Sequence, residues 1–340
     1  MSIDAVTKFY DASKELGEPL LLSFSLTDDC NLDCRHCRQK EYGHEDLSIE
    51  DIKKIIDKVG NETFINLILF TGGEPLVRKD FFKILDYALS KDFEAGIVTN
   101  GILLPRFAKR LKDSGVSAIK VSLDGFDEIS HNKIRGKGSF VRAVKGIEEA
   151  VANDIYVSVS TVVMNNNIKG IERMVPLLND LGVGNLEIVR CIPMGSARAH
   201  DVCPGKEEHL NALKIFVDKW SDEGTFKVVI DDPVANYLFP TNDNLVCTSC
   251  RGLGPVISIL TNGDVVPTQT LDVVLGNALK ESFEEIYKKE LTQRLWNFEE
   301  HLPEKCGKCP VKESCLGGCR GHAMKSKGLF AEDPFCPFEA

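Results

Sequence analysis

The sequence contains no apolar stretch long enough to cross a bilayer. A membrane-spanning helix needs about 18 to 20 consecutive apolar residues, and no run in these 340 residues approaches that length. The first five residues, Met1 to Ala5, show neither a basic segment nor an apolar core, so they do not predict a signal peptide. We therefore expect a cytoplasmic protein with no membrane partner.

The chain also lacks an excess of basic residues. It has 41 Lys and Arg against 51 Asp and Glu, a formal net charge of −10, which disfavours a sequence-independent grip on nucleic acid. It shows no solenoid repeat and no low-complexity segment. With 43% hydrophobic and 27% charged residues, the composition is that of a globular protein, and the length predicts one large domain with a smaller one.

Cysteine, in contrast, is abundant and unevenly distributed. Three of the 12 cysteines lie near the start, seven lie between Cys247 and Cys336, and two, Cys191 and Cys203, lie between these groups. In a reducing compartment this pattern favours metal ligands over disulfides. Cys191 follows a predicted strand and is interpreted as a small buried thiol, and Cys203 as a loop thiol.

The first three cysteines have the spacing C-x₃-C-x₂-C at Cys30, Cys34 and Cys37. Three thiolates on one short loop can hold three irons of a [4Fe–4S] cube and leave the fourth iron open to a small molecule. A structural zinc site would need a fourth ligand. His36 is adjacent to Cys37, and neighbouring residues in a tight loop rarely both reach one metal, so the pattern favours the cube.

Short β-like runs alternate with amphipathic segments over residues 20 to 195. Such alternation predicts a parallel sheet with helical crossovers, here an α/β fold with an incomplete (β/α)₆ TIM-like barrel and chemistry at the carboxyl ends of the strands. The expected strands are 20–26, 64–70, 94–98, 118–123, 156–163 and 186–191, and the expected helices are 48–59, 80–89, 104–114, 140–153, 168–181 and 207–221. The expected domains are an N-terminal extension (1–17), the partial barrel (18–200), a helical bridge (201–245) and a small cysteine-rich domain (246–340).

Polar and glycine-rich clusters follow several of the predicted strands. The second strand leads into Gly72-Gly73-Glu74-Pro75, where the glycines permit close backbone approach to a ligand and Glu74 can accept hydrogen bonds from an ammonium group. The other clusters begin at Thr99, Ser122 and Ile192. Because parallel strands end on one rim, these clusters are expected to form a single site.

The cysteine trio followed by Gly72-Gly73-Glu74-Pro75 resembles the radical S-adenosylmethionine enzymes over about residues 18 to 195. The resemblance implies that S-adenosylmethionine chelates the open iron, that an electron from the cluster cleaves its C5′–S bond, and that the 5′-deoxyadenosyl radical abstracts a hydrogen atom from a substrate. It also implies a low-potential electron donor of the flavodoxin or ferredoxin type. The candidate cofactor contacts are Gly72, Gly73, Glu74, Pro75, Thr99, Asn100, Ser122, Asp124, Arg135, Pro193 and Met194. Arg135 and the nearby His131 can instead form a helix cap or salt bridge, and no protein residue is assigned a catalytic role.

The C-terminal cysteines resemble the SPASM extension, which carries auxiliary [4Fe–4S] clusters in one branch of these enzymes. The resemblance implies an outer cluster held by Cys306, Cys309, Cys315 and Cys336, and an inner cluster held by Cys319, Cys247 and Cys250. The family pattern places a further cysteine where this chain has Thr268. The inner cluster therefore has an open iron, or is completed by Thr268 or water, or is absent. A zinc ribbon is the alternative that C-x₂-C spacing alone allows.

The expected function is that of a radical S-adenosylmethionine oxidoreductase or maturase. The first substrate class is a peptide or protein undergoing oxidative maturation, and the second is a tetrapyrrole modified on its side chains in a haem-type pathway. Cys30 lies too near the N-terminus to leave room for a leader-binding domain, so a separate partner would hold a peptide. A non-catalytic iron–sulfur electron carrier is the alternative of another class. Glu187 and Arg190 flank the sixth strand as candidate barrel-lining charges.

Overall fold

The computed structural model describes residues 12–13, 15–39, 45–250 and 252–339, and its main feature is one long, mostly parallel sheet. The strand order is β11-β10-β9-β1-β2-β3-β4-β5-β6-β7-β8. Neighbours from β1 to β8 are parallel and β9 is parallel to β1, whereas β10 and β11 are antiparallel additions at that edge. The strands are β1 (Leu21–Ser25), β2 (Leu67–Thr71), β3 (Glu94–Thr99), β4 (Ala118–Ser122), β5 (Tyr156–Val163), β6 (Asn185–Arg190), β7 (Lys227–Asp231), β8 (Leu245–Cys247), β9 (Val256–Ile259), β10 (Asp264–Val266) and β11 (Gly276–Asn277).

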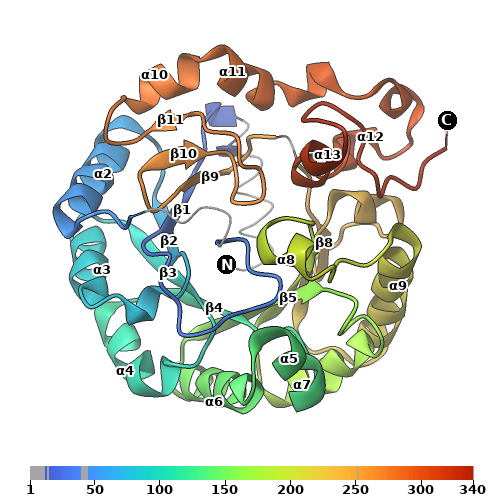
Figure 1. Cartoon of the computed structure of the whole chain (residues 1–340), viewed down its shortest axis with the longest axis horizontal. Coiled ribbons are helices and arrows are strands. Elements are labelled where there is room, and N and C mark those ends of the chain that lie inside the picture. Colours follow the sequence, from blue (N-terminus) through green and yellow to red (C-terminus); the bar gives the residue numbers. More distant parts are fainter. Residues whose placement is uncertain (1–11, 14, 40–44, 251, 340) are drawn as a thin grey trace.

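The sheet curls into an open barrel, and the helices form a ring around it (Figure 1). The C-terminal segment, in orange and red, lies across the gap between α2 and α9 (Figure 1). No helix of the described residues is long and apolar enough to span a membrane. The α-helices are α2 (Ile49–Glu62), α3 (Phe81–Leu89), α4 (Leu104–Ser114), α5 (Glu128–Arg135), α6 (Ser139–Ala152), α7 (Met174–Asp180), α8 (Gly195–Ala199), α9 (Lys206–Glu223), α10 (Phe283–Lys288), α11 (Glu290–Trp296), α12 (Lys312–Cys315) and α13 (Arg320–Ser326), and the 3₁₀ helices are η2 (Pro75–Val77), η3 (Ile171–Arg173), η4 (Pro233–Tyr237), η5 (Phe298–His301) and η6 (Glu304–Lys308).

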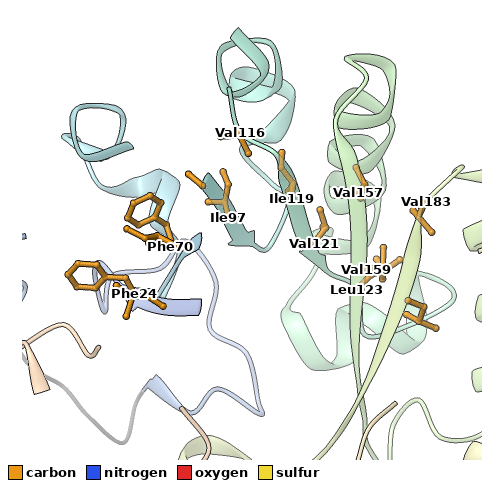
Figure 2. Close-up of a cluster of buried hydrophobic side chains, with 14 of the residues drawn as sticks. Phe24, Phe70, Ile97, Val116, Ile119, Val121, Leu123, Val157, Val159 and Val183 are labelled. Carbon is orange, nitrogen blue, oxygen red and sulfur yellow. The ribbon is translucent and has the colours of Figure 1, made fainter. Parts of the chain in front are cut away.

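Alternation along each strand separates an apolar outer layer from a polar interior. On β4, Ile119 and Val121 are fully buried, whereas Lys120 and Ser122 are half-buried. Successive side chains of a strand point to opposite faces, so the buried set packs against the helices and the other set lines the barrel lumen. Figure 2 shows part of the outer layer, from Phe24 on β1 to Val159 on β5.

The predicted architecture of six β-strands with crossover helices is confirmed, and the sheet extends beyond it at both edges. Strands β7 and β8 continue the parallel order after β6, and β9 continues it before β1. The predicted helix 168–181 is instead η3 followed by α7, and η3 begins after Gly170 in the left-handed conformation. The predicted domain boundaries remain predictions, although the sheet runs across two of them.

Candidate cofactor and cluster sites

The three N-terminal cysteines lie on the loop that follows β1, at the carboxyl end of the sheet. Two backbone hydrogen bonds from the next strand's loop hold this segment in place: Gly73 N donates to Thr27 O (2.7 Å) and Glu74 N donates to Asp29 O (2.9 Å). Cys30 is exposed, and Cys34 and Cys37 are half-buried. Burial raises the pKa of Cys30 and of Cys34, and a charge on Cys37 adds to the rise at both, so the three thiols interact electrostatically.

The electrostatics of the loop suit thiolates that become charged when iron binds. Burial raises the pKa of Cys34 to about 11, and the positive charge of Arg135 opposes that rise. Asn100 Nδ2 lies 3.8 Å from Cys30 Sγ and can donate to it. Cluster assembly removes the thiol protons. The Arg135 guanidinium and the Asn100 side-chain amide can then stabilise the negative charge of the thiolates. The donor set therefore fits three ligands of a [4Fe–4S] cube.

The glycines at 72 and 73 serve this loop directly. A Cβ at position 72 would lie 2.3 Å from Thr27 O, and a Cβ at position 73 would lie 2.4 Å from Asp29 O. Gly72 also has a φ of +130°, which side-chain-bearing residues rarely adopt. In this structure, Gly72 and Gly73 allow the loop after β2 to approach the backbone of the cysteine loop closely. The sequence-based interpretation had assigned this close approach to a ligand.

The steric contact at Gly73 predicts that Gly73→Ala lowers iron content. The methyl group would meet two backbone carbonyls, those of Asp28 and Asp29, so the cysteine loop must move away from β2. We expect the reconstituted variant to hold about four fewer irons per chain, measured by colorimetric iron analysis. The matched control is Gly254→Ala, whose added methyl meets no atom within 4 Å, and an unchanged iron content in Gly73→Ala would contradict the prediction.

Glu74 is completely buried and joins the loops that follow β2 and β3. Its carboxylate accepts hydrogen bonds from Thr99 Oγ1 (2.9 Å to each oxygen), Asn100 N (2.8 Å) and Leu76 N (3.2 Å). Burial raises the pKa of Glu74 to about 7, against the lowering effect of these bonds. The hydrogen bonds of Glu74 and Thr99 in this structure thus go to the protein itself, and the assignment of both residues as cofactor contacts remains a prediction.

The raised pKa of Glu74 predicts that stability falls as pH rises from about 4.5 to about 7. Below an unfolded-state pKa of 4.5 both states hold the proton. Above it the unfolded chain releases a proton that the folded chain keeps, which costs about 3 kcal/mol across the window. We expect Glu74→Gln to flatten this dependence in denaturant titrations of the apoprotein at pH 5, 6 and 7, whereas equal slopes in both proteins would contradict it.

A second buried charge cluster lies against the cysteine loop where β4 leads into α5. Asp124 is fully buried, and it accepts from Arg135 Nε (2.5 Å) and Val162 N (2.8 Å). His36 Nε2 lies 3.5 Å from both Asp124 Oδ2 and Arg135 Nη2. His131 Nδ1 accepts from Asp124 N (3.1 Å), and burial lowers the pKa of His131 to about 4, so its ring is neutral. Arg135 therefore forms a buried ion pair with Asp124 next to Cys34, and neutral His131 accepts a backbone hydrogen bond beside it.

The remaining predicted cofactor contacts lie on the same rim. Pro75 begins η2, and Ser122 ends β4 beside Asp124. Met194 is buried and Pro193 half-buried in the loop after β6, and Ser196 N from that loop donates to Cys37 O (2.9 Å). The structure thus brings the other four strand-end clusters together around the cysteine loop, although their individual contacts with a cofactor remain predictions.

The four cysteines predicted for the outer auxiliary cluster line one pocket. Cys306, Cys309, Cys315 and Cys336 surround it together with the glycines at 317 and 318. Burial raises the pKa of Cys315 to about 12, and the charges of Cys336 and Cys306 add to that rise. Four thiols around one pocket fit a fully ligated [4Fe–4S] cluster.

The inner auxiliary set is less complete. Burial raises the pKa of Cys319 to about 12 and a charge on Cys250 raises it further, so these two thiols are neighbours. Cys247 Sγ instead lies 3.9 Å from Phe239 O, and Thr268 Oγ1 lies 3.0 Å from Thr270 Oγ1. Within the described ranges no three His, Cys, Asp or Glu side chains are arranged to hold a single metal ion, and this holds for all three cysteine groups alike. The ligand set of this cluster stays a prediction.

An ionic network that the sequence-based reasoning missed links the barrel to the C-terminal domain. Arg190, at the end of β6, donates to Asp232 (Nε to Oδ2, 2.9 Å) and to both oxygens of Asp333 (2.8 Å). His209 Nε2 lies 2.7 Å from Asp232 Oδ2, and Cys319 N donates to Asp333 Oδ2 (2.6 Å). These side chains are at most 2% exposed. Arg190 thus does not line the lumen, whereas Glu187 does and pairs there with Lys120 (2.9 Å).

Comparison with known proteins places the chain in a family. The model of the radical SAM superfamily matches residues 24–178, and the model of the SPASM iron–sulfur cluster-binding domain matches residues 247–310. The mycofactocin maturase MftC of Mycobacterium ulcerans is 30% identical over 316 residues, which cover 89% of this chain and 84% of that protein. This chain belongs to the radical SAM superfamily. The AdoMet-dependent heme synthase of Nitratidesulfovibrio vulgaris is 28% identical over 351 residues, covering 96% and 94%.

The fold of this radical SAM protein is also that of a solved structure, anSMEcpe with bound AdoMet and the Cp18Cys peptide. The TM-score is 0.73 at 20% identity, with 94% of each chain covered. The protein is therefore a radical SAM enzyme, which binds S-adenosylmethionine and a [4Fe–4S] cluster in the barrel and carries auxiliary iron–sulfur clusters in its SPASM domain. Together the cofactors supply a 5′-deoxyadenosyl radical that abstracts a hydrogen atom from a substrate.

Proposed function

We propose that the enzyme carries out oxidative maturation of a peptide or protein, with the substrate bound in the barrel lumen beneath the cysteine loop. Cys30, Cys34 and Cys37 hold the S-adenosylmethionine cluster, and the C-terminal cysteines hold the clusters that take the electron left on the substrate. The same fold in anSMEcpe was solved with a bound peptide, which motivates the substrate class. The observation that carries the proposal is the chemistry of the lumen.

The lumen offers hydrogen-bonding groups and two carboxylates that already have protein partners. Lys120 Nζ is paired with Glu187 Oε1 at 2.9 Å, and Asp231 Oδ1 accepts from Thr248 Oγ1 at 3.0 Å. Gln269 Nε2 reaches Ser23 and Ser25 Oγ on β1, each at 3.0 Å. Hydroxyl and amide groups suit the backbone of an extended peptide, and the carboxylates of Glu187 and Asp231 disfavour a substrate carboxylate beside them.

A tetrapyrrole substrate is the second candidate, because the heme synthase relative matches this chain over almost its whole length. A tetrapyrrole with carboxylate side chains would need basic groups of the protein to pair with those carboxylates. Of the buried arginines next to the cluster sites, Arg135 and Arg190 are neutralised by Asp124 and by Asp232 with Asp333. Arg320 donates instead to backbone carbonyls of its own domain. The charge arrangement therefore favours the peptide over the tetrapyrrole.

Deuterium transfer separates the two substrate classes. The full chain is reconstituted anaerobically and reduced with dithionite in place of the low-potential ferredoxin or flavodoxin that we propose as donor. It then receives S-adenosylmethionine with either a pool of perdeuterated cellular peptides or a perdeuterated carboxylated iron porphyrin. Mass spectrometry of 5′-deoxyadenosine reports the source of the abstracted atom. We expect a one-dalton increase with the peptide pool only, and an increase with the porphyrin would replace our proposal by the second candidate.

The auxiliary cluster's role predicts a separation of two activities in Cys309→Ala. Cys309 lines the outer cluster pocket, far along the chain from the cysteine loop. We expect the variant to form 5′-deoxyadenosine without substrate at a rate within about twofold of the native enzyme and to yield no oxidised substrate by mass spectrometry, since the electron left on the substrate has no exit. Oxidised product formed by Cys309→Ala at the native rate would contradict a role of this cluster in substrate oxidation.

A further inference from the structure

Two cysteines outside every cluster group lie together in the fold. Cys191 directly follows β6, Cys203 precedes α9, and their sulfurs are bonded as a disulfide. Their Cα atoms are 5.2 Å apart, within the range that a disulfide spans without backbone movement. The sequence-based expectation of one buried thiol and one loop thiol is therefore wrong, because the chain folds back within the sequence separation of 12 that divides the two cysteines.

The surroundings of this pair suit a disulfide and do not suit a metal. Cys191 is 2% exposed, and it packs with Ile134, Met164, Ala197 and Val202. An apolar environment disfavours the thiolates that a metal needs and favours the uncharged S–S bond. Cys203 is half-buried at the edge of this cluster, so one sulfur of the pair is accessible to a small reagent and the other is not.

The residues between the two cysteines contact the cluster loop. Ser196 N donates to Cys37 O (2.9 Å), and a Cβ at Gly195 would lie 2.5 Å from the same carbonyl. The C-terminal side of this segment is fixed to the loop after β5, where Asn165 N donates to Val202 O (2.9 Å) and Asn165 Nδ2 donates to Cys203 O (3.3 Å). The disulfide thus fixes both ends of a segment whose middle lies on Cys37.

We propose that Cys191 and Cys203 are a reversible thiol–disulfide site that couples cofactor binding to the thiol redox state. Its co-reactant is a low-molecular-weight disulfide. The Cys203 thiolate attacks this disulfide and releases one thiol, and the Cys191 thiolate then displaces the second from the mixed disulfide. The protein pair loses two electrons and two protons, and the small disulfide gains them as two thiols.

The consequence for the cofactor rests on the proposed function and on the sequence-based prediction that Pro193 and Met194 contact S-adenosylmethionine. With the bond closed, the segment is held on Cys37 in the geometry seen here. With the bond open, Cys203 can separate from Cys191 and the segment gains conformational freedom. Binding of S-adenosylmethionine then includes the entropic cost of ordering the segment again. We expect affinity for S-adenosylmethionine to fall at least about fivefold on reduction, the lower end of typical coupling between two sites.

Differential alkylation tests the pairing without any turnover. The anaerobic holoenzyme is treated with oxidised glutathione or with dithiothreitol, checked for unchanged iron content, and alkylated with light iodoacetamide. It is then denatured, reduced and alkylated with heavy iodoacetamide before digestion. We expect heavy label on both Cys191 and Cys203 only after oxidised glutathione, and a cross-linked peptide when the final reduction is omitted. Light label on either residue after oxidised glutathione would overturn the proposal.

Equilibrium dialysis with S-adenosylmethionine tests the coupling. We expect the oxidised enzyme to bind at least about fivefold more tightly than the reduced enzyme, and Cys203→Ser to bind like the reduced enzyme under both treatments. Equal affinities of the oxidised and reduced native enzyme, with the disulfide mapped, would overturn the coupling. An enzyme that forms the disulfide but binds no S-adenosylmethionine in either state would instead refute the proposed function.

Discussion

Replacing Cys34 with alanine is expected to abolish formation of 5′-deoxyadenosine. Cys34 lies at the centre of the cysteine loop, where its backbone carbonyl accepts from Cys37 N (3.2 Å) and its thiol lies near Arg135. With two thiolates left, the cube loses an anchor as well as its unique open iron. Because removing a partner of a metal ligand already costs about 10- to 100-fold, loss of the ligand should lower the rate by about 100-fold or more.

Two measurements on the reconstituted protein check this prediction. Liquid chromatography of the anaerobic reaction with dithionite and S-adenosylmethionine measures 5′-deoxyadenosine, and iron analysis should show about four fewer irons per chain than the native protein. Cys309→Ala is the matched control, because it removes one thiol from a different cluster site and is expected to retain the product. A Cys34→Ala protein that forms 5′-deoxyadenosine at the native rate would show that the open cluster lies elsewhere.

The barrel was predictable because its strands are short, apolar and separated by amphipathic segments. The helix predicted at 104–114 has the observed bounds, since its apolar positions repeat at helical spacing and Gly115 ends it in the left-handed conformation. The strands added after β6 were not predicted. β8 has only three residues, and a strand this short carries no period of its own, so its place depends on pairing with β7.

The cysteine groups were predictable from spacing, whereas the contacts around them were not. Spacing along one loop is local information, and it identified the N-terminal trio, whereas the resemblance to the SPASM extension implied the four thiols that the structure places together at the outer pocket. The pairing of Cys191 with Cys203 depends on the direction in which a loop returns. Likewise, the burial of Glu74 depends on two loops that meet only in the folded sheet, so the sequence could indicate a carboxylate on the rim but not its protein partners.

The Arg190 network is the clearest case of a feature that only tertiary structure creates. Its members come from β6, the residue after β7, α9 and the last loop of the chain. Each is an isolated charged residue in the sequence, and the sequence-based reasoning placed Arg190 in the lumen. In the fold, Arg190 joins the barrel to Asp333, which also accepts a hydrogen bond from Cys319 N. The intact network should therefore determine how firmly the SPASM domain is attached.

Replacing Arg190 with methionine is therefore expected to destabilise the protein severely. The side chain is 2% exposed, and its partners Asp232 and Asp333 are 1% and 0% exposed. Methionine fills similar space but leaves two carboxylates buried with no guanidinium, and breaking a buried ion pair by removing one partner costs about 3 to 5 kcal/mol. Arg190 Cζ also lies 4.8 Å from the centroid of the Phe335 ring. Methionine can pack on this ring but cannot replace the cation–π attraction of the guanidinium.

A denaturant titration followed by circular dichroism measures the apparent free energy of unfolding of each variant. The matched control is Lys109→Met, because Lys109 forms an exposed pair with Asp113 (3.1 Å), and loss of a surface pair should change stability by less than about 1 kcal/mol. Arg190→Lys keeps the charge but cannot bind two carboxylates in a fork, so it should fall between native and Arg190→Met. If Arg190→Met is as stable as Lys109→Met, the buried network does not hold the two domains together, and the auxiliary clusters must be positioned by the apolar contacts between barrel and SPASM domain.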